Sequence, residues 1–521
     1  MRGIAAFIFL LLLASAPAAA QAPLPHLREQ GVARQLIVDG EPFLILGGEL
    51  ANSSASSLDY MAPIWPRLRA LNLNTVLAPV SWELIEPEEG RFDFSLVDGM
   101  LREARRHDLR LVLLWFGSWK NSQSSYVPAW VKNDFTRFPR ARAADGTAME
   151  MLSPFAEANA EADARAFAAL MRHLARSDSQ RTVVMVQVEN EVGMIPDARD
   201  HHPLAEAAFA EPVPAALVPS GQRRGSWHSQ FGEAAEESFT AWHFARYVER
   251  VAAAGKAEHA LPMFANAALP RPGRRPGEYP SGGPLPHLAA IWRAGAPSID
   301  FLAPDIYYPN FVEWTRRYRE AGQPLFIPEA GRAGAGEAPA DALFAIGALN
   351  AIGFSPFSID SPTEAELASL AEAYAGLRAL SPLILSHQGR GTMTGLRPPR
   401  AFDGALDEAD QSVTMGRWRL TARFVDPWTP REQQRIAEHG ALAIQLGPDE
   451  FLVAGSGVTL TFAAAVGADR AGIESIWEGR YADGSWIPGR LLNGDESHQG
   501  RHLRLPPGRF GLQRVRLYRY R

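Results

Sequence analysis

Short apolar runs alternate with amphipathic stretches from Phe43 to about Asp360, and this alternation constrains the fold more than any other feature of the sequence. Stretches such as SLVDGMLREARRHD repeat apolar residues at intervals of three and four, which is typical of helices packed on a sheet. Strands that alternate with helices predict βα units around a parallel sheet. The predicted strands are FLILGG (43–48), NTVLAPV (74–80), LRLVLLWF (109–116), TVVMVQVEN (182–190), PMFANA (262–267), IDFLAPDIY (299–307), PLFIPEA (324–330) and GFSPFSID (353–360).

Eight such repeats suit a closed barrel better than an open sheet, because open sheets usually have fewer strands. We therefore predict an α/β fold in which a (β/α)8 TIM barrel occupies residues 36–380. Beyond about Pro382 the pattern changes to glycine-punctuated, alternating stretches such as VTMGRWRLTARFVD. Alternation with a period of two is typical of antiparallel strands, so residues 381–521 are predicted to form a smaller all-β, sandwich-like domain.

The first twenty residues have the pattern of an export signal. Arg2 precedes an apolar run at residues 4–13, and a small-residue cleavage site follows at residues 18–20. The run is shorter than the roughly 20 residues that cross a bilayer comfortably, although an uncleaved anchor is the alternative. We predict a signal peptide at residues 1–20 and an exported protein, periplasmic or extracellular, that is not attached to the membrane after the signal is removed.

Composition excludes several classes of protein. The chain has no cysteine, so disulfides and thiolate metal sites play no part. Its net charge of -6 and the lack of a long Lys/Arg run exclude the usual nucleic-acid binder. His201 and His202 are adjacent, but no further ligand follows at zinc-like spacing, so we expect no metal and no cofactor. Nothing in the sequence indicates the oligomeric state.

Acidic residues close the fourth predicted strand, in VVMVQVENEVG (183–193). The apolar residues predict a buried strand, which would place Asn190 and Glu191 at the mouth of the barrel. A carboxyl group that is partly desolvated there has a raised pKa and can stay protonated to donate to a leaving oxygen. The amide of Asn190 can bond a sugar hydroxyl. The alternative for Glu191 is a solvated loop carboxylate.

A second strand-like run, PLFIPEAGR (324–332), ends in an acid, Glu329, and is followed by small residues. Retaining glycosidases need two carboxyl groups about 5 to 5.5 Å apart, one to protonate and one to attack. Glu191 would end strand four and Glu329 strand seven, and side chains from opposite strands of a small barrel can converge. We therefore predict that Glu191 is the acid/base and Glu329 the nucleophile; two unrelated structural acids are the alternative.

Other side chains near these strand ends are candidate substrate contacts. Tyr307 ends the sixth predicted strand and could donate its hydroxyl to Glu329, although core packing is equally compatible with the sequence. Three tryptophans lie at the ends of strands two and three, where an indole face could stack on a sugar ring or fill the core; they are Trp82, Trp115 and Trp119. Acids at other strand ends could also contact substrate, and they include Glu49 and the acid of DIYYPN.

The placement of the two acids at strands four and seven resembles a clan of barrel glycosidases. Within that clan, QVENEV resembles the Gln-x-Glu-Asn-Glu signature of glycoside hydrolase family 35, the β-galactosidases. The similarity spans about residues 40–360, and the C-terminal region resembles the β-rich accessory domain of a bacterial branch of this family. NTVLAPVSWELIEPEEGRFDF (74–94) resembles the family's second-strand segment, with matches at Trp82, Glu86, Pro87, Gly90 and Phe94.

The resemblance implies a retaining β-galactosidase that removes terminal, non-reducing β-D-galactosyl residues, including side chains of a polysaccharide such as xyloglucan. The chain departs from the family pattern at residues 180–182 (QRT), which replace Gly-Gly-Pro, and at Val192, which replaces an aromatic residue. LWFGSWKNSQSSY replaces Arg-Pro-Gly-Pro-Tyr, so Lys120 and Asn121 stand near the family's galactose contacts. Rival interpretations are an endo-acting mannanase or glucanase of the same clan and a catalytically silent carbohydrate-binding barrel.

Overall fold

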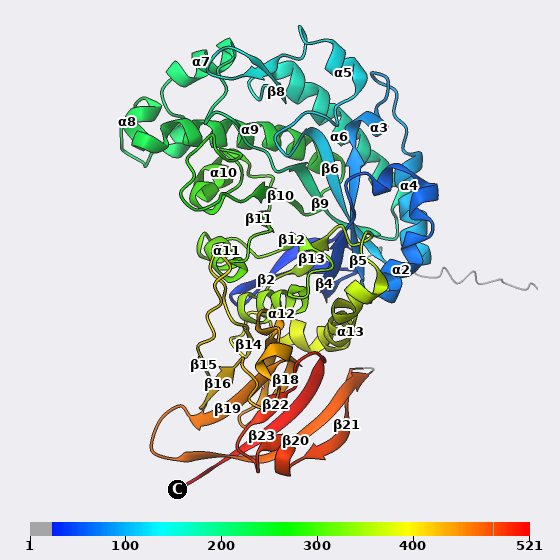
Figure 1. Ribbon diagram of the computed structural model, residues 1–521. Coiled ribbons are helices and arrows are strands. Elements are labelled where there is room, and N and C mark those ends of the chain that lie inside the picture. The colour runs from blue at the N-terminus through cyan, green and yellow to red at the C-terminus, as the bar shows by residue number, and fades with distance from the viewer. Residues whose placement is uncertain (1–22, 483) are drawn as a thin grey trace, which may run out of the picture.

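The larger part of the protein is a closed barrel of eight parallel strands (Figure 1). The computed structural model describes residues 23–482 and 484–521, so the predicted export signal lies outside the described residues. All eight predicted strands are barrel strands, and the predicted barrel is confirmed. In order around the barrel they are β4 (Ile45–Glu49), β5 (Thr75–Ser81), β6 (Arg110–Lys120), β9 (Val183–Asn190), β10 (Met263–Ala268), β11 (Phe301–Ile306), β12 (Ile327–Arg332) and β13 (Gly353–Phe357).

The barrel strands are largely apolar and buried because both of their faces are covered, and their polar residues lie mostly toward the C-terminal ends. Every residue of β9 is buried, and side chains that point inward fill the barrel with a cluster that includes Phe264, Phe301 and Phe326. Leu36 and Val38 belong to the same cluster. These two residues come from a three-stranded antiparallel sheet that precedes the barrel in the chain. The sheet covers the N-terminal end of the barrel strands, so the opposite end is left for polar groups. Its strands are β1 (His26–Gln30), β2 (Ala33–Val38) and β3 (Glu41–Phe43).

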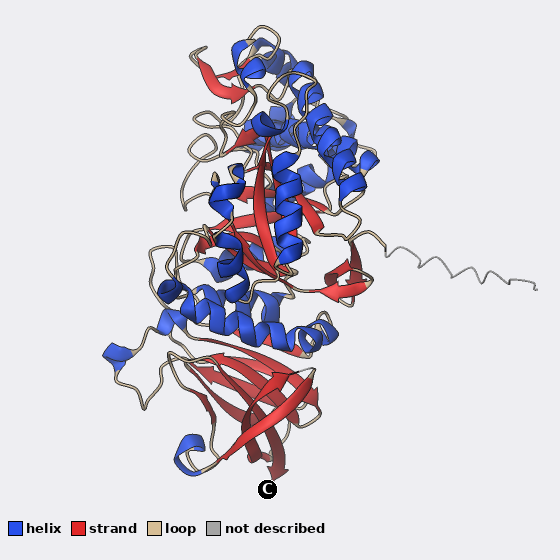
Figure 2. Ribbon diagram, turned by 90° about the vertical axis from the view of Figure 1, so that its right-hand side faces the viewer, coloured by secondary structure: helices blue, strands red, loops and turns tan. Residues whose placement is uncertain are grey.

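Amphipathic helices surround the barrel (Figure 2). The two longest between β6 and β10 pack on each other through buried alanine and phenylalanine side chains. No helix among the described residues is long and apolar enough to cross a membrane. The principal helices are α4 (Ser95–Arg106), α6 (Glu157–Ser177), α9 (Ala235–Glu258), α10 (Ala289–Gly295), α11 (Phe311–Glu320), α12 (Ala338–Leu349) and α13 (Glu364–His387).

The C-terminal part consists of two antiparallel sheets, as predicted for an all-β domain. Their facing sides share a second core cluster, to which Trp418, Leu420 and Phe451 contribute. The six-stranded sheet has the order β14 (Met393–Leu396), β17 (Gly440–Gly447), β18 (Glu450–Ser456), β23 (Gly511–Tyr520), β20 (Arg470–Ala482) and β21 (Ser485–Leu492). The four-stranded sheet has the order β15 (Gln411–Met415), β16 (Trp418–Arg423), β19 (Val458–Ala464) and β22 (Leu503–Leu505).

Helix α12 joins the two parts of the molecule, because one side of it packs on the barrel and the other on β14 and β17 (Figure 1). The contact is close: a Cβ atom on Gly347 would lie 2.8 Å from the backbone nitrogen of Gly395. Beside it, Arg397 is 1% exposed, donates to Glu337 at 3.1 Å and to the backbone carbonyl of Ala437, and forms an ion pair with Asp341. A buried guanidinium therefore fastens the β domain to the barrel.

We expect Arg397→Ala to lower the free energy of unfolding by about 2 to 3 kcal/mol, because it leaves the carboxylate of Asp341 without its cation and leaves Glu337 paired with Arg400 alone. Thermal and urea denaturation would measure the loss. Arg490→Ala is the matched control, since it breaks an exposed pair with Glu478, and exposed ion pairs contribute little to stability. Equal effects of the two substitutions would contradict this account of the joint.

Candidate active site

Polar side chains gather where the parallel strands of the barrel end. Glu49 ends β4, Lys120 ends β6, and Asn190 ends β9, with Glu191 directly after it. Two further acids, Asp305 on β11 and Glu329 on β12, lie opposite each other in the strand register. Strands that run in the same direction end at the same rim, so the fold brings these distant residues together.

The two predicted catalytic acids meet in space. One carboxylate oxygen from each of Glu191, Asp305 and Glu329 lies within 4.8 Å of the other two. Glu191 is 5% exposed and Glu329 4%. The chain at the end of β9 is strained, because Glu189 and Glu191 have φ angles of 63° and 45°, in the left-handed region. Strain of this kind persists where the surroundings impose it, and it occurs often at functional sites.

Glu191 is held by its backbone and by its carboxylate. Its N–H donates to Oδ1 of Asn266 at 3.1 Å, and the side-chain amide of Asn121 donates to its Oε2. Asn266 in turn donates to Asp305 at 2.5 Å. Burial and the neighbouring charge of Glu329 raise the pKa of Glu191 to about 7, against the opposing charge of Lys120 and a hydrogen bond with Asp305. Glu191 is thus a carboxyl group poised between its acidic and basic forms near neutral pH.

Glu329 has a different environment. The hydroxyl of Tyr307 donates to its Oε1, while its Oε2 is buried without a hydrogen-bond partner. Burial raises the pKa of Glu329, but the charge of Lys120 and the hydrogen bond from Tyr307 both lower it. Tyr307 is 44% exposed, and its hydroxyl lies on the carboxylate of Glu329.

Lys120 is the positive group of this cluster. Burial lowers its pKa, yet the charges of Glu329, Glu191, Glu49 and Asp305 outweigh burial, and the net shift is upward. Burial followed by the charge of Glu329 raises the pKa of Glu49 and of Asp305 well above the usual range. Four carboxyl groups around one ammonium group repel one another when they are ionised. This repulsion favours protonation of some of the carboxyl groups.

Several buried polar atoms at this rim have no hydrogen-bond partner among the described residues. Both amide atoms of Asn190, which is 1% exposed, are unpaired. Oε1 of Glu49, Oδ1 of Asp305 and Oγ of Ser355 are unpaired as well. Buried polar groups in folded proteins almost always have partners, and their concentration at one strand-end rim is typical of a place where a polar ligand binds.

The structure corrects the expectation that three tryptophans stack on a sugar. Trp82, Trp115 and Trp119 are each 0% exposed and offer no ring face to a ligand. Trp119 packs among aromatic side chains of α9, and its backbone N–H donates to the buried carboxylate of Glu189 at 2.8 Å. The indole of Trp115 donates to Asp163 at 2.8 Å. These tryptophans shape the wall behind the carboxyl cluster instead of contacting substrate.

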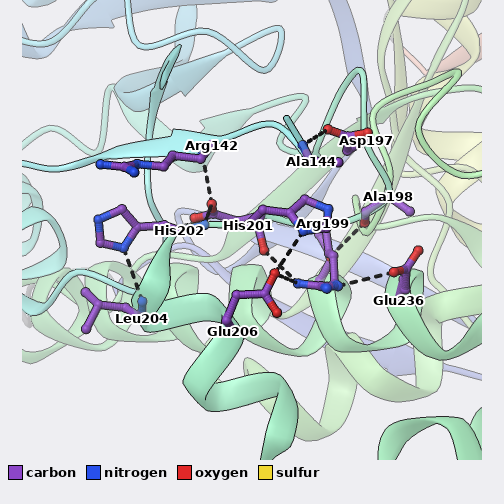
Figure 3. A network of polar contacts seen from close by, with 12 residues as sticks. Arg142, Ala144, Asp197, Ala198, Arg199, His201, His202, Leu204, Glu206 and Glu236 are labelled. Atoms are coloured by element: carbon purple, nitrogen blue, oxygen red, sulfur yellow. Dashed lines mark hydrogen bonds and ion pairs between the residues drawn. The ribbon is translucent and has the colours of Figure 1, made fainter. Parts of the chain in front are cut away.

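The long connection between β9 and α9 is fastened by a polar network (Figure 3). Arg199 donates to Glu206 at 2.8 Å and to Glu236 at 3.2 Å, and His201 contacts the same oxygen of Glu206 at 2.9 Å. His202 turns the other way, and its Nδ1 accepts from the N–H of Leu204. The two histidines thus have separate structural partners, and the network fixes the chain just beyond Glu191.

Three site residues were not among the predictions from sequence. Asn266 could have been found, because PMFANA places a polar side chain at the end of β10 just as Asn190 stands at the end of β9. Asp163, which is buried on α6, and Glu189, whose pKa burial and Asp163 raise, form a supporting layer behind the rim. No pattern in the sequence marks Asp163, since it lies among ordinary helix-forming residues.

Comparisons with known proteins agree with this picture of the barrel. Residues 35–258 match the family model described as "Glycosyl hydrolases family 35", and residues 370–504 match a "domain of unknown function (DUF5597)". A β-galactosidase of Xanthomonas manihotis is 30% identical over 213 residues, which cover 38% of this chain and 32% of that protein. The chain therefore aligns with about a third of this curated relative.

Among solved structures, the β-galactosidase from Rahnella sp. R3 has a TM-score of 0.48 at 16% identity, with 70% of this chain and 58% of that chain covered. The β-galactosidase from Marinomonas ef1 has a TM-score of 0.47 at 12% identity, with 66% and 60% covered. The family match at residues 35–258 contains the first four barrel strands together with Asn190 and Glu191. The resemblance to glycoside hydrolase family 35 is thereby confirmed for this part of the barrel.

Proposed function

We propose that this chain is a retaining glycoside hydrolase that removes terminal β-D-galactosyl residues from oligo- or polysaccharides. The observation that carries the proposal is the separation of the carboxylate oxygens of Glu191 and Glu329, which is within 4.8 Å. Retaining enzymes hold their two carboxyl groups about 5 to 5.5 Å apart, whereas inverting enzymes leave about 6.5 to 9.5 Å for a water molecule. The family match at residues 35–258 supports hydrolysis of a galactoside.

The reaction is a double displacement. An oxygen of Glu329 attacks the anomeric carbon, the glycosidic C–O bond breaks, and Glu191 gives its proton to the leaving oxygen. A water molecule then attacks the same carbon while Glu191 takes a proton from it, and the bond to Glu329 breaks with its electrons returning to the carboxylate. Oε2 of Glu329 is the oxygen available for attack, because Oε1 already accepts from Tyr307.

The charges of the cluster favour this assignment of roles. Lys120 and the Tyr307 hydroxyl lower the pKa of Glu329 and so favour its ionised form, which a nucleophile requires. Glu191, with a pKa of about 7, is substantially protonated at neutral pH and can act as the acid. Burial and the charge of Glu329 raise the pKa values of Asp305 and Glu49, which favours their protonated forms and leaves Lys120 to offset the charge of Glu329.

The pH dependence follows from the same groups. Glu191 donates only when protonated, so kcat/KM is expected to fall as the pH rises through about 7. Glu329 attacks only when ionised, so kcat/KM also falls as the pH drops through its raised pKa. The pair titrates as a coupled system, and a bell-shaped profile with its basic limb near neutrality is the expected result. A profile that stays flat from pH 6 to 9 would contradict the role given to Glu191.

Tyr307→Phe removes the hydrogen bond to Glu329 and leaves the ring in place. We expect kcat/KM to fall about 10- to 100-fold, because a charge-assisted hydrogen bond is worth about 1.5 to 3 kcal/mol. The acidic limb of the pH profile should also move to higher pH, since this bond lowers the pKa of Glu329. A normal profile with reduced activity would assign Tyr307 to substrate binding alone.

A panel of aryl glycosides tests the proposal as a whole, together with product analysis on a galactosylated xyloglucan oligosaccharide. We expect hydrolysis of the β-galactoside and release of single galactose units. Internal fragments would instead indicate an endo-acting enzyme, and a protein inactive on every glycoside would be a binding barrel. Lys120, Asn121 and Asn190 remain the proposed sugar contacts, and export to the periplasm or the exterior remains a proposal from the sequence.

A further inference from the structure

The outer face of the C-terminal domain carries a cavity of about 360 Å3. Side chains of β16 alternate, so that Leu420 and Ala422 enter the core while Thr421 and Arg423 point away from it. The cavity lies over these outward residues and the facing threonines of β19. The six-stranded sheet and α12 stand between this face and the barrel, so the cavity is separate from the carboxyl cluster (Figure 1).

An exposed tryptophan forms one wall of this cavity. Trp428 is 48% exposed, and its ring lies 4.8 Å from the ring of His502 and 5.8 Å from that of His498. The guanidinium of Arg504 lies 5.4 Å from the centre of the indole. An exposed indole that is supported by other planar groups keeps a free surface at a fixed angle, which lowers the entropic cost of binding a ligand.

The loop that carries Trp428 is rigidly held. Asp426, two residues earlier, is 3% exposed and accepts two hydrogen bonds from Arg504, at 2.9 and 2.7 Å. Thr429 donates to the same carboxylate at 2.5 Å, and Gln434 bonds the backbone on both sides of the tryptophan. The tryptophan is therefore positioned by a buried ion pair, although it contributes little to the core itself.

The remaining lining residues supply hydrogen-bonding groups. His502 is 4% exposed and its Nε2 is buried without a partner. Among the described residues, the guanidinium of Arg501 bonds a backbone oxygen and the side chain of Gln499 and is not paired with a carboxylate. The one acid of the lining, Asp410, is already paired with Arg423. An apolar platform with donors around it is suited to a ligand that has a flat apolar face and a rim of oxygen atoms.

We propose that this cavity binds a pyranose unit of a polysaccharide, with Trp428 as the stacking platform and Arg501 and His502 as hydrogen-bonding groups at the edge of the sugar. The C–H face of a pyranose ring matches the indole, and its hydroxyl oxygens match the donors. The volume of the cavity is at the lower end of the range for ligand pockets, which suits one or two sugar units. Binding of a sugar at this cavity does not depend on whether the barrel hydrolyses glycosides.

Electrophoresis of the full chain in native gels that contain soluble xyloglucan, galactan or polygalacturonate tests the proposal. All proteins carry Glu329→Gln, so that the barrel does not consume the polysaccharide. We expect at least one polysaccharide to retard the protein, and Trp428→Ala to weaken this binding at least about fivefold. Arg501→Gln, at an exposed position, should weaken it about threefold without affecting the fold.

Trp477→Ala is the matched control, because Trp477 is 37% exposed on β20 of the same domain and lies outside the cavity. The Trp477→Ala protein should be retarded as strongly as the parent protein. All variants should unfold at the same temperature. Trp428→Ala in the otherwise unaltered chain should hydrolyse an aryl galactoside as the parent does, which separates this site from the barrel. Absence of retardation by every polysaccharide, or equal retardation of the Trp428 and Trp477 variants, would overturn the proposal.

Discussion

Glu329→Gly should reduce turnover of an aryl β-galactoside about 10⁵-fold, since removal of a nucleophile abolishes the covalent route. The substitution also opens space beside the anomeric carbon, where azide ion can enter. Azide would then attack from the face that Glu329 occupies, and the product would be the α-galactosyl azide. Recovery of activity with azide, together with the α configuration of the product by NMR, assigns Glu329 as the attacking group.

Two variants control for damage to the fold. Glu329→Gln preserves the volume of the side chain and should be equally inactive without azide, but it should show no rescue because no space is opened. Glu237→Gln alters a carboxyl group of comparable burial, 4% exposed, that is bonded to Tyr279 and His287 away from the cluster, and it should retain activity. Residual turnover above about one tenth in either Glu329 variant is incompatible with a nucleophilic role.

Glu191→Gln should have an effect that depends on the leaving group. For an alkyl or sugar leaving group, which needs a proton, formation of the glycosyl-enzyme should slow by about 10² to 10⁴-fold. For dinitrophenolate, which leaves without a proton, this first step should be nearly unchanged and hydrolysis of the intermediate should become limiting. Pre-steady-state measurement of the released phenol distinguishes the two steps, because a burst is expected only for the activated substrate.

The pH profile provides the control for Glu191. The basic limb near pH 7 should disappear in Glu191→Gln, because burial and the charge of Glu329 place the pKa of Glu191 at about that value. Asn121→Ala is the matched variant, since it removes a hydrogen bond to Glu191 but keeps the carboxyl group. The basic limb of the pH profile should therefore remain, at a shifted pH. A uniform loss of rate across all leaving groups would remove Glu191 from the acid/base role.

The positions of Glu191 and Glu329 were predictable from sequence because each follows an apolar strand of known rank. Parallel strands in a barrel end at one rim, so rank alone indicates that their side chains converge. The relation of Asp305 and Asn266 to Glu191 was not predictable, because it depends on side-chain directions and not on spacing. The family resemblance predicted that Lys120 lies near the substrate. Its position among four carboxyl groups became visible only in the structure.

The tryptophan predictions failed for a physical reason that concerns one strand. We expected the third strand to end at Phe116, whereas β6 continues to Lys120. Trp119 therefore lies within the strand and packs against Phe244 and Tyr247 instead of standing on the rim. The boundaries of a strand are hard to predict from apolar periodicity, because polar partners that are distant in sequence, such as Glu189, can satisfy additional strand residues.

The joint between the two parts of the molecule shows a second limit of sequence reasoning. A change in pattern near Pro382 separates helical from alternating stretches, but it does not reveal that α12 packs on β14 and β17. Leu442 and Ile444 of the β domain belong to the core cluster of the barrel, and Arg397 adds a buried charge to the same joint. Long-range packing of this kind depends on shape, which no local pattern encodes.

In the proposed reaction one carboxylate attacks and the other protonates across a shared site, so the configuration of the sugar at the moment of its release is the most direct test. Proton NMR of an aryl β-galactoside reaction, followed from the first turnovers before mutarotation, would report it. The account predicts that β-galactose appears first and the α anomer only later. Initial release of α-galactose would show a single displacement and contradict the roles given to Glu191 and Glu329.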